Sequence, residues 1–334
     1  MQQRSRVTIN DVARTAGVSV ATVSKVLNGR YGVAVDTSAR VKKVVDELGY
    51  ESSLVARSLR SQRTNVIGIL VAEFEPFSTE LLKGTSQAIA DTGYELLAYS
   101  GGGRAGGDVG WERRYLSRLS GTLIDGAVLV TPTVVDASNG VPVVAVDPHT
   151  GPSGMPTVDS DSLRGAVLAT QHLLALGHRR IGFLGGRPDL ESARLREEGY
   201  RTALLEAGIA PDPMLMRVGG YRPETADQPA HELLTLAARP TAIFAANDLS
   251  AIRTMEVARG LGLRVPDDLS VIGFDNVPES AMTVPGLTTI NQPIRRMGSE
   301  AIRLLVGLIA GVAGTSTHLT LPTELVERGS CRAL

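Results

Sequence analysis

The sequence has little cysteine and few aromatic residues. Among its 334 residues there is one cysteine, Cys331, and aromatic side chains make up 4%. One cysteine excludes an intramolecular disulfide framework and a cysteine-based zinc cluster, so we expect a reducing compartment, the cytoplasm. The five histidines do not have the spacing of a metal site. We therefore predict neither a metal nor a cofactor.

Long hydrophobic runs are also missing. The longest apolar run, residues 304–314, is interrupted by glycine and is shorter than the roughly 18 residues that a membrane helix requires. The first residues lack the apolar region of a secretory signal. With 43% hydrophobic and 21% charged residues, the composition is that of a globular chain of about two domains. We expect no association with a membrane.

Neither sign of charge is in excess overall, because the net charge is −1, but the charges are unevenly distributed. Residues 1–63 contain 11 basic and 5 acidic side chains, a balance of +6, which leaves −7 for the remainder. A basic segment on an acidic body is typical of a protein whose one end binds a polyanion such as DNA. A solvated basic face gives the same pattern, so charge alone does not decide the function.

The basic segment begins with the pattern of two short helices. Thr8 precedes an apolar-periodic run, and Asp11 lies three residues further on, as in a capping box. The first helix is predicted to end at Gly17, a residue that readily adopts positive φ. Ser19 is a suitable N-cap for a second helix over residues 20–28. Two helices joined by a three-residue glycine turn indicate a helix-turn-helix.

A third amphipathic helix is predicted over residues 37–48. On the second helix, Val23, Val26 and Leu27 share one face and are predicted to point inward. The opposite face is then free to enter the major groove of DNA. An ordinary three-helix bundle has the same helix spacing, so the spacing leaves both alternatives open.

Residues 7–13 (VTINDVA), 16–19 (AGVS), 22–28 (TVSKVLN) and 48–50 (LGY) closely resemble, without gaps, the head of the LacI/GalR (lactose-repressor) family. Residues 55–60 resemble the family's hinge helix, especially that of its purine-repressor branch. The resemblance implies a homodimer that binds a pseudo-palindromic operator in double-stranded DNA, with its two hinge helices in the minor groove.

The resemblance implies two kinds of DNA contact, position by position. The side chains expected to reach bases are Val20, Ala21, Lys25 and Leu59. The residues expected to contact the DNA backbone are Thr8, Ser19, Thr22, Ser24, Asn28 and Arg60. Val20 and Ala21 are able to read only apolar features such as a thymine methyl group, whereas Lys25 is able to donate to guanine. Leu59 would wedge into a central base step, although packing within the dimer's hinge is its alternative role.

From residue 65 onward, short apolar runs alternate with helical patterns. The predicted strands are 66–72, 94–99, 126–130, 141–146, 181–184, 242–246 and 269–274. Apolar strands separated by helices imply parallel sheets covered on both faces, and their number predicts two doubly wound lobes. The chain is expected to cross between the lobes near residues 158–162 and 291–293. Ligands of such folds bind beyond the carboxyl ends of the strands, so we expect a pocket between the lobes.

The resemblance to the family continues through this body, at residues 176–181, 192–196, 247–248, 271–275, 287–290 and 321–325. It implies a periplasmic-binding-protein-like effector domain. The pocket residues that it implies are Arg196 and Asp275 as a polar clamp, Asp147, Asn247 and Gln292 as hydrogen-bonding groups, and Phe74, Phe77 and Tyr221 as apolar walls. Such a set suits a polyhydroxyl ligand. The alternatives are a structural salt bridge between Arg196 and Asp275, and core packing for Phe74 and Phe77.

Two other classes of protein are less consistent with the sequence. Gly101, Gly103 and Gly106 satisfy a G-x-G-x-x-G pattern after a strand, but Asp125 precedes the next strand instead of ending it as a ribose-binding carboxylate should. An NAD-dependent enzyme is therefore disfavoured, and no other enzyme motif is present. A solute-binding protein of a transporter is disfavoured by the basic head and by the missing signal sequence.

The sequence as a whole predicts an α/β fold with an N-terminal helix-turn-helix head of three helices in residues 1–50 and a hinge helix and linker in residues 51–64. A two-lobed, doubly wound, periplasmic-binding-protein-like body follows in residues 65–334. Lobe 1 is expected at about 65–160 and 293–320, and lobe 2 at about 161–292 and 321–334.

The predicted function is that of a transcription regulator, a repressor and not an enzyme, whose operator affinity is controlled by a small ligand bound between the lobes. Leu190 offers no second guanidinium for a purine edge, so a sugar is favoured over a purine. A protein corepressor remains a further alternative.

Overall fold

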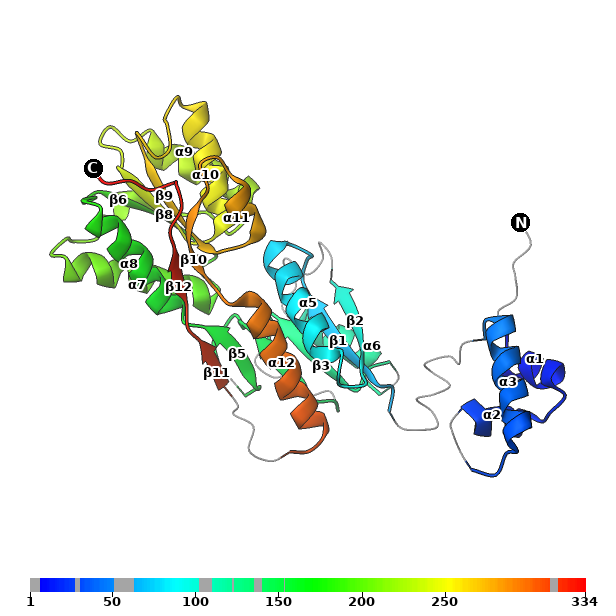
Figure 1. Ribbon diagram of the computed structural model, residues 1–334. Coiled ribbons are helices and arrows are strands. Elements are labelled where there is room, and N and C mark those ends of the chain that lie inside the picture. Colours follow the sequence, from blue (N-terminus) through cyan, green and yellow to red (C-terminus); the bar gives the residue numbers. More distant parts are fainter. Residues whose placement is uncertain are drawn as a thin grey trace. The chain divides into compact units, whose positions relative to one another are not determined.

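The computed structural model describes residues 7–27, 31–50, 63–101, 110–121, 123–134, 140–152, 154–312 and 318–334. The chain divides into two compact units, residues 1–64 and residues 65–334 (Figure 1). Each unit has its own hydrophobic core.

The smaller unit contains the helices α1 (Ile9–Ala16), α2 (Val20–Leu27) and α3 (Val35–Leu48). Its core consists of small aliphatic side chains from all three helices: Val12, Ala13, Ala16, Val23, Val26, Val41 and Val44. α3 begins two residues earlier than the sequence predicts. The prediction that Leu27 points inward is wrong, because this side chain, at the last residue of α2, is 38% exposed.

The turn between α1 and α2 has the predicted geometry. The backbone N–H of Thr8 donates to the Asp11 carboxylate over 2.9 Å, as in a capping box. Gly17 has φ 65°, in the left-handed region, and its position ends α1. Ser19 Oγ then accepts a hydrogen bond from the backbone N–H of Thr22 at 3.1 Å and caps α2. The two hydrogen bonds and the left-handed glycine position α2 on the small core.

The larger unit contains two six-stranded sheets, and the first has the strand order β11-β5-β4-β3-β1-β2, with all strands parallel. Its strands are β1 (Val66–Val71), β2 (Glu95–Ser100), β3 (Gly126–Val130), β4 (Val143–Val146), β5 (Thr157–Ser160) and β11 (His318–Leu321). Its helices are α5 (Pro76–Ile89), α6 (Trp111–Leu119) and α12 (Ile294–Ile309). α5 and α12 pack side by side over one face of this sheet (Figure 1).

The second sheet has the strand order β12-β10-β9-β8-β6-β7. Its strands are β6 (Ile181–Gly185), β7 (Met216–Val218), β8 (Ala242–Ala245), β9 (Ser270–Asp275), β10 (Thr288–Asn291) and β12 (Glu324–Val326), of which β12 is antiparallel to β10. Its helices are α7 (Ser162–Ala175), α8 (Glu191–Glu206), α9 (Pro223–Leu234), α10 (Asp248–Gly260) and α11 (Pro278–Met282), with a 3-10 turn η2 (Pro213–Leu215).

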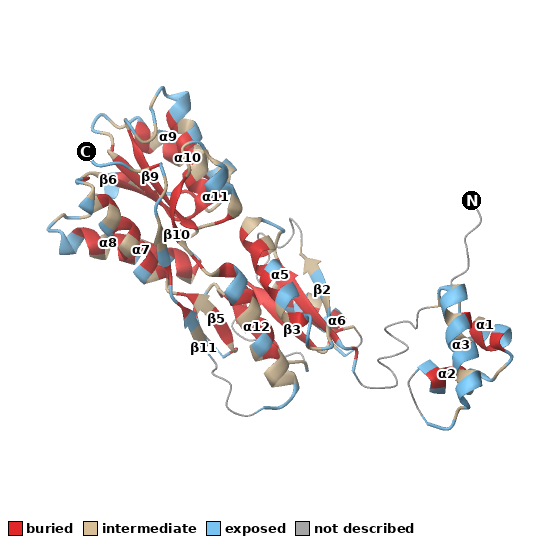
Figure 2. Cartoon of the chain, in the orientation of Figure 1, coloured by how far each residue is buried: buried red, intermediate tan, exposed pale blue. Residues whose placement is uncertain are grey.

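Helices cover both faces of the second sheet. α7 and α8 pack on one face against Phe183, Phe244 and Phe274, and α9 and α10 pack on the other. The inner strands of both sheets are accordingly buried along almost their whole length, whereas the edge strands β2, β7, β11 and β12 are only partly buried (Figure 2). This is the doubly wound α/β arrangement that the sequence predicts.

The chain passes between the sheets three times: after β5, after β10 and after β11. The first two crossings lie at the predicted segments. Among the described residues, no helix has the length and apolar character needed to traverse a lipid bilayer.

Candidate functional site

A cleft of about 410 Å³ lies between the two lobes of the larger unit. The first lobe contributes residues from the loops after β1, β3 and β4, and the second contributes residues from α8 and from the loops after β7, β8 and β9. These loops follow the carboxyl ends of parallel strands, which is where ligands bind in open α/β sheets.

The backbone is unusual where it lines the cleft. Asp147, Tyr221 and Asp275 each have positive φ, at 48°, 70° and 112°. Aspartate tolerates the left-handed region, but a tyrosine rarely adopts it. Such conformations persist only where the surroundings enforce them, and they concentrate at functional sites.

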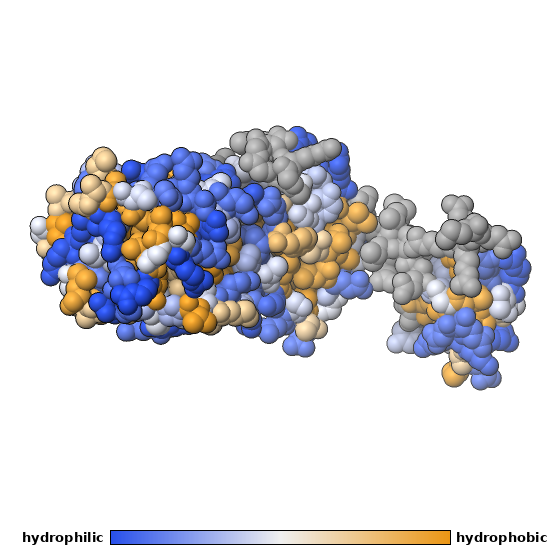
Figure 3. Space-filling view, turned by 90° about the horizontal axis from the view of Figure 1, so that it is seen from above, coloured by the Kyte–Doolittle hydropathy of each residue, from blue (hydrophilic) through white to orange (hydrophobic). Residues whose placement is uncertain are grey.

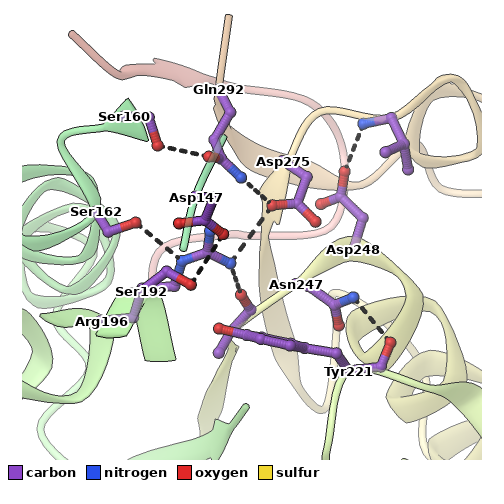
Figure 4. Close-up of polar contacts among 12 residues, drawn as sticks. Asp147, Ser160, Ser162, Ser192, Arg196, Tyr221, Asn247, Asp248, Asp275 and Gln292 are labelled. Atoms are coloured by element: carbon purple, nitrogen blue, oxygen red, sulfur yellow. Dashed lines mark hydrogen bonds and ion pairs between the residues drawn. The ribbon is translucent and has the colours of Figure 1, made fainter. Parts of the chain in front are cut away.

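Arg196, on α8, is the centre of the polar side chains at the cleft floor (Figure 4). It is only 3% exposed, and its guanidinium donates to the Ala246 carbonyl at 2.5 Å and to Asp275 Oδ1 at 3.4 Å. The guanidinium carbon also lies 3.8 Å from the centre of the Phe274 ring. These contacts fix the orientation of the guanidinium, which is the preorganisation that a binding group needs.

Asp275 joins the second lobe to a crossing segment. Its carboxylate accepts a hydrogen bond from Gln292 Nε2 at 2.5 Å, and Gln292 Oε1 in turn accepts one from Ser160 Oγ at 2.5 Å. Ser160 and Gln292 lie at two of the three crossings between the sheets. Asp275 is therefore connected by hydrogen bonds to two of the segments where the chain crosses between the lobes.

Asp147 and Asn247 lie on opposite walls. Asp147 accepts a hydrogen bond from Ser192 Oγ of the second lobe at 3.1 Å. Asn247 caps α10 through its side-chain oxygen and donates its amide to the Tyr221 carbonyl at 3.0 Å. The structure thus brings together Asp147, Arg196, Tyr221, Asn247, Asp275 and Gln292 from the predicted set.

Three carboxyl groups act on the guanidinium of Arg196: the buried Asp248 and Asp275, and the partly buried Asp147. Burial raises the pKa of Asp275 to about 6, although Arg196 opposes this rise. Burial also raises the pKa of Asp147, again against the effect of Arg196. Burial, followed by repulsion from Asp275, holds the pKa of Asp248 well above its usual range.

The three predicted aromatic wall residues have different environments. Phe77 lies in the first turn of α5, lines the cleft and is 9% exposed. Tyr221 also lines the cleft, and its hydroxyl is buried without a hydrogen-bond partner among the described residues. Phe74 is 54% exposed and is not part of the cleft wall, because the loop after β1 directs Glu73 and Glu75 to the cleft instead.

Several ionisable residues that line the cleft or lie beside it were not expected from the sequence. Glu73 of the first lobe forms an ion pair of 2.9 Å with Arg222 of the second, and His149 lies 3.3 Å from Asp189. Glu75 also lines the cleft. All five lie in loops or at a helix cap, where periodicity gives no signal.

The smaller unit presents the expected face of α2 to solvent. Val20 is 36% exposed, Ala21 and Lys25 are also exposed, and Ser19 and Thr22 lie at the amino-terminal end of the same helix. Thr8 is exposed at the start of α1, and Ser24 is half-buried. These side chains form a small polar and apolar surface around one cation, which suits contact with DNA bases and phosphates.

Some predicted residues lie outside the described residues: Asn28, Leu59, Arg60, Gly103 and Gly106. Asp125, the candidate ribose-binding carboxylate of the disfavoured enzyme hypothesis, accepts a hydrogen bond from the backbone N–H of Asn65 at 2.8 Å. Within the described part of the chain, no group of three histidine, cysteine, aspartate or glutamate side chains is arranged to hold a metal ion.

Comparison with known proteins identifies both units. Residues 8–53 match the model of bacterial regulatory proteins of the lacI family, and residues 170–331 match that of a periplasmic binding protein-like domain. The HTH-type transcriptional regulator CelR of Thermobifida fusca is 35% identical over 99% of this chain and 100% of its own.

Two solved structures extend the comparison. A complex of the transcriptional regulator CelR with cellobiose matches with a TM-score of 0.72 and 33% identity, over 97% of this chain and 100% of that one. The lac repressor dimer bound to operator and the anti-inducer ONPF matches with a TM-score of 0.85 and 28% identity, over 98% of this chain and 100% of that one. With these similarities along its whole length, the chain belongs to the lacI family of bacterial transcription regulators.

Proposed function

We propose that this protein is a sequence-specific DNA-binding repressor, active in the cytoplasm, whose affinity for its operator is controlled by a sugar bound in the cleft. One observation carries the proposal: the chain joins a helix-turn-helix head to a cleft whose floor is the preorganised cluster of Arg196, Asp275 and Gln292. A regulator needs both parts, a DNA reader and a ligand sensor.

The chemistry of the cleft favours a polyhydroxyl ligand. A carboxylate and a guanidinium side by side supply acceptors and donors to neighbouring hydroxyl groups, and aromatic rings supply apolar faces for C–H groups. Leu190 stands on the cleft wall, so no guanidinium is available at that position for a purine edge. A relative of this chain has been solved with cellobiose, which agrees with a sugar ligand.

Control of DNA binding follows from thermodynamic linkage. A ligand shifts the arrangement of the two lobes only as far as its affinities for the two arrangements differ. Because the cleft floor is bonded to the crossing residues Ser160 and Gln292, a ligand on Asp275 biases the lobe arrangement. Operator affinity then changes by the same coupling factor.

DNA contact is assigned to the head. Val20, Ala21 and Lys25 contact base edges in the major groove, and Leu59 in the hinge contacts the minor groove. Phosphates are bound by Thr8, Ser19, Thr22, Ser24, Asn28 and Arg60. The phosphate contacts set the register, and the few base contacts supply the sequence preference.

A homodimer would match the two halves of a pseudo-palindromic operator. The larger unit carries exposed apolar side chains that suit such an interface, among them Met282 at the end of α11, Val284 shortly after it, and Leu97 on the edge strand β2. Figure 3 shows that hydrophobic residues reach the surface of this unit in patches among hydrophilic ones. Patches of this kind mark protein interfaces.

The test combines footprinting with a ligand panel. The full-length protein should protect a pseudo-symmetric DNA site, with an affinity that falls steeply as salt increases. A panel of sugars and nucleobases should contain a sugar that changes this affinity, and Asp275→Ala should abolish that response while operator binding without ligand is retained. Absence of specific protection at low salt would disprove the DNA-binding proposal, and a response only to nucleobases would disprove the sugar.

A further inference from the structure

We propose that the cleft selects against anionic ligands, so that the effector is a sugar without phosphate or carboxylate groups, and that Glu75 and Glu224 impose this selection. The identification of the ligand as a sugar rests on the proposed function. The statement about charge rests on the cleft alone.

Every guanidinium on the cleft wall is already engaged by a carboxylate of the protein. Among the described lining residues the arginines are Arg187, Arg196 and Arg222. They pair with Asp189 at 2.6 Å, with Asp275 at 3.4 Å and with Glu73 at 2.9 Å. A phosphate or carboxylate bound to any of these guanidinium groups would therefore lie beside the protein carboxylate that already pairs with it, and the two anions would repel each other.

Carboxylates on the wall outnumber the guanidinium groups. The lining carboxylates are Glu73, Glu75, Asp147, Glu224 and Asp275. Among the residues that the structure describes, neither Glu75 nor Glu224 has an ion-pair partner. The charge that the protein leaves uncompensated in the cleft is therefore negative, and it repels anions most strongly where the walls exclude water.

Glu75 occupies a central place in this arrangement. It is the N-cap residue of α5 and lines the cleft, whose walls surround its carboxyl group and remove part of its hydration. This desolvation, with repulsion from Asp275 and Glu73 and against the effect of Arg222, raises its pKa to about 7. At pH 8, about one unit above this pKa, about nine-tenths of the Glu75 carboxyl is ionised, so its effect on an anion is then near its maximum.

The remaining polar groups of the wall favour neutral partners. Burial and the neighbouring Arg187 lower the pKa of His149, so this ring adds no positive charge at pH 8. The Tyr221 hydroxyl is buried and has no partner among the described residues. A buried polar group without a partner is unfavourable, and a hydroxyl group of a neutral ligand would supply the missing hydrogen bond without adding charge to the cleft.

The experiment measures the charge of the cleft without the natural ligand. In full-length protein, Cys331→Ser removes the sole cysteine, and Leu249→Cys places a thiol on the cleft wall. The thiol is treated at pH 8 with neutral, anionic and cationic methanethiosulfonate reagents. Each rate is divided by the rate of the same reagent with 2-mercaptoethanol, which removes intrinsic differences between the reagents.

We expect the normalised rate of the anionic reagent to be about tenfold below that of the neutral one, and the rate of the cationic reagent to exceed both. Glu75→Gln and Glu224→Gln should each reduce the difference between anionic and neutral reagents by about threefold. Glu95→Gln, which removes an exposed carboxylate from β2, is the matched control and should leave the difference unchanged. Equal normalised rates, or a difference that persists in both cleft variants, would overturn the proposal.

A second measurement uses the sugar that the panel selects. Calorimetry should show that its phosphorylated and carboxylated analogues bind at least about tenfold more weakly, and that Glu75→Gln narrows this gap. An anionic analogue that binds as tightly as the neutral sugar overturns the charge proposal and leaves the sugar-binding function intact. If no sugar binds, the proposed function fails, and the thiol rates still decide the charge of the cleft.

Discussion

The two walls of the cleft are held in different ways. On the second lobe, Arg196 and Asn247 are fixed by hydrogen bonds to that lobe's own backbone, at the carbonyls of Ala246 and Tyr221. On the first lobe, the side chains of Glu73 and Asp147 pair, among the described residues, with Arg222 and Ser192 across the cleft. Arg196 and Asn247 are therefore held within their own lobe, whereas Glu73 and Asp147 are oriented by contacts with the opposite lobe.

A ligand-controlled regulator has two requirements, affinity for the ligand and coupling of that affinity to the arrangement of the lobes, and the two walls differ in which of them they serve. A preformed wall provides affinity, because its groups need no ordering when the ligand binds. A wall whose contacts depend on lobe position makes affinity sensitive to that position, which is the requirement for coupling. Removing Arg196 from the second wall should consequently lower the stability of the fold, whereas removing Glu73 from the first should mainly change the affinity for the ligand.

The largest effect is expected for Arg196→Ala in the second wall. Removing this guanidinium leaves the Asp275 and Asp147 carboxyl groups buried without their cation, which should lower the free energy of unfolding by about 3–5 kcal/mol. Chemical denaturation measures this loss. Arg194→Ala on the same helix, which removes an exposed ion pair with Glu191, is the control and should cost less than about 1 kcal/mol.

Asp275 should make the stability of the protein depend on pH. Its pKa rises from 3.8 in the unfolded chain to about 6 in the folded one, so the folded state holds the proton more tightly. The resulting stabilisation is complete below pH 4 and is lost as pH rises through about 6, a difference of about 3 kcal/mol. Asp275→Asn should flatten the pH profile of unfolding between pH 4 and 7. A profile as steep as that of the parent would show that another group carries the titration.

Asp248 supports the second wall from behind, because it is buried in the second lobe and does not line the cleft. It is fully buried and accepts hydrogen bonds from the Val277 backbone N–H at 2.9 Å and from Thr289 Oγ1 at 2.5 Å. Asp248→Ala leaves both donors without an acceptor and should lower the free energy of unfolding by about 1–3 kcal/mol. Asp248→Asn keeps an acceptor oxygen and should lower the free energy of unfolding less than Asp248→Ala does. If both variants unfold like the parent protein, the wall is less rigid than its contacts imply.

The same contrast explains what the sequence was able to predict. Arg196, Asn247 and Asp275 follow buried strands or lie on a helix within motifs of the family, so both pattern and resemblance locate them. The first wall is a loop after β1, where Phe74 was predicted to face the cleft and Glu73 and Glu75 do so instead. Loop register depends on tertiary packing and turn geometry, which hydrophobic periodicity does not encode.

The hydrogen bond between Asp147 and Ser192 shows another feature of the site that the sequence does not predict. Asp147 was predicted for the cleft, but its hydrogen bond spans 45 positions of the chain and joins the two lobes. Alternating strands and helices predict that two lobes exist. They do not predict which side chains meet across the cleft, because that depends on how closely the lobes approach.

The smallest effect is expected for the ion pair between Glu73 and Arg222, which is the most direct test of the first wall. Their side chains are 38% and 54% exposed, so a double-mutant cycle with Glu73→Gln and Arg222→Gln should give a coupling of about 0.2–1 kcal/mol in unfolding experiments, reduced further by salt. The pair of Arg201 and Glu197 within α8 is the matched control, since it has similar exposure and does not join the lobes. Both cycles should be equally small in unfolding, but only the first should change the affinity for the effector, because only that pair joins the lobes. A coupling above about 2 kcal/mol would mean that the first wall is held as firmly as the second, and the two walls would then no longer differ in kind.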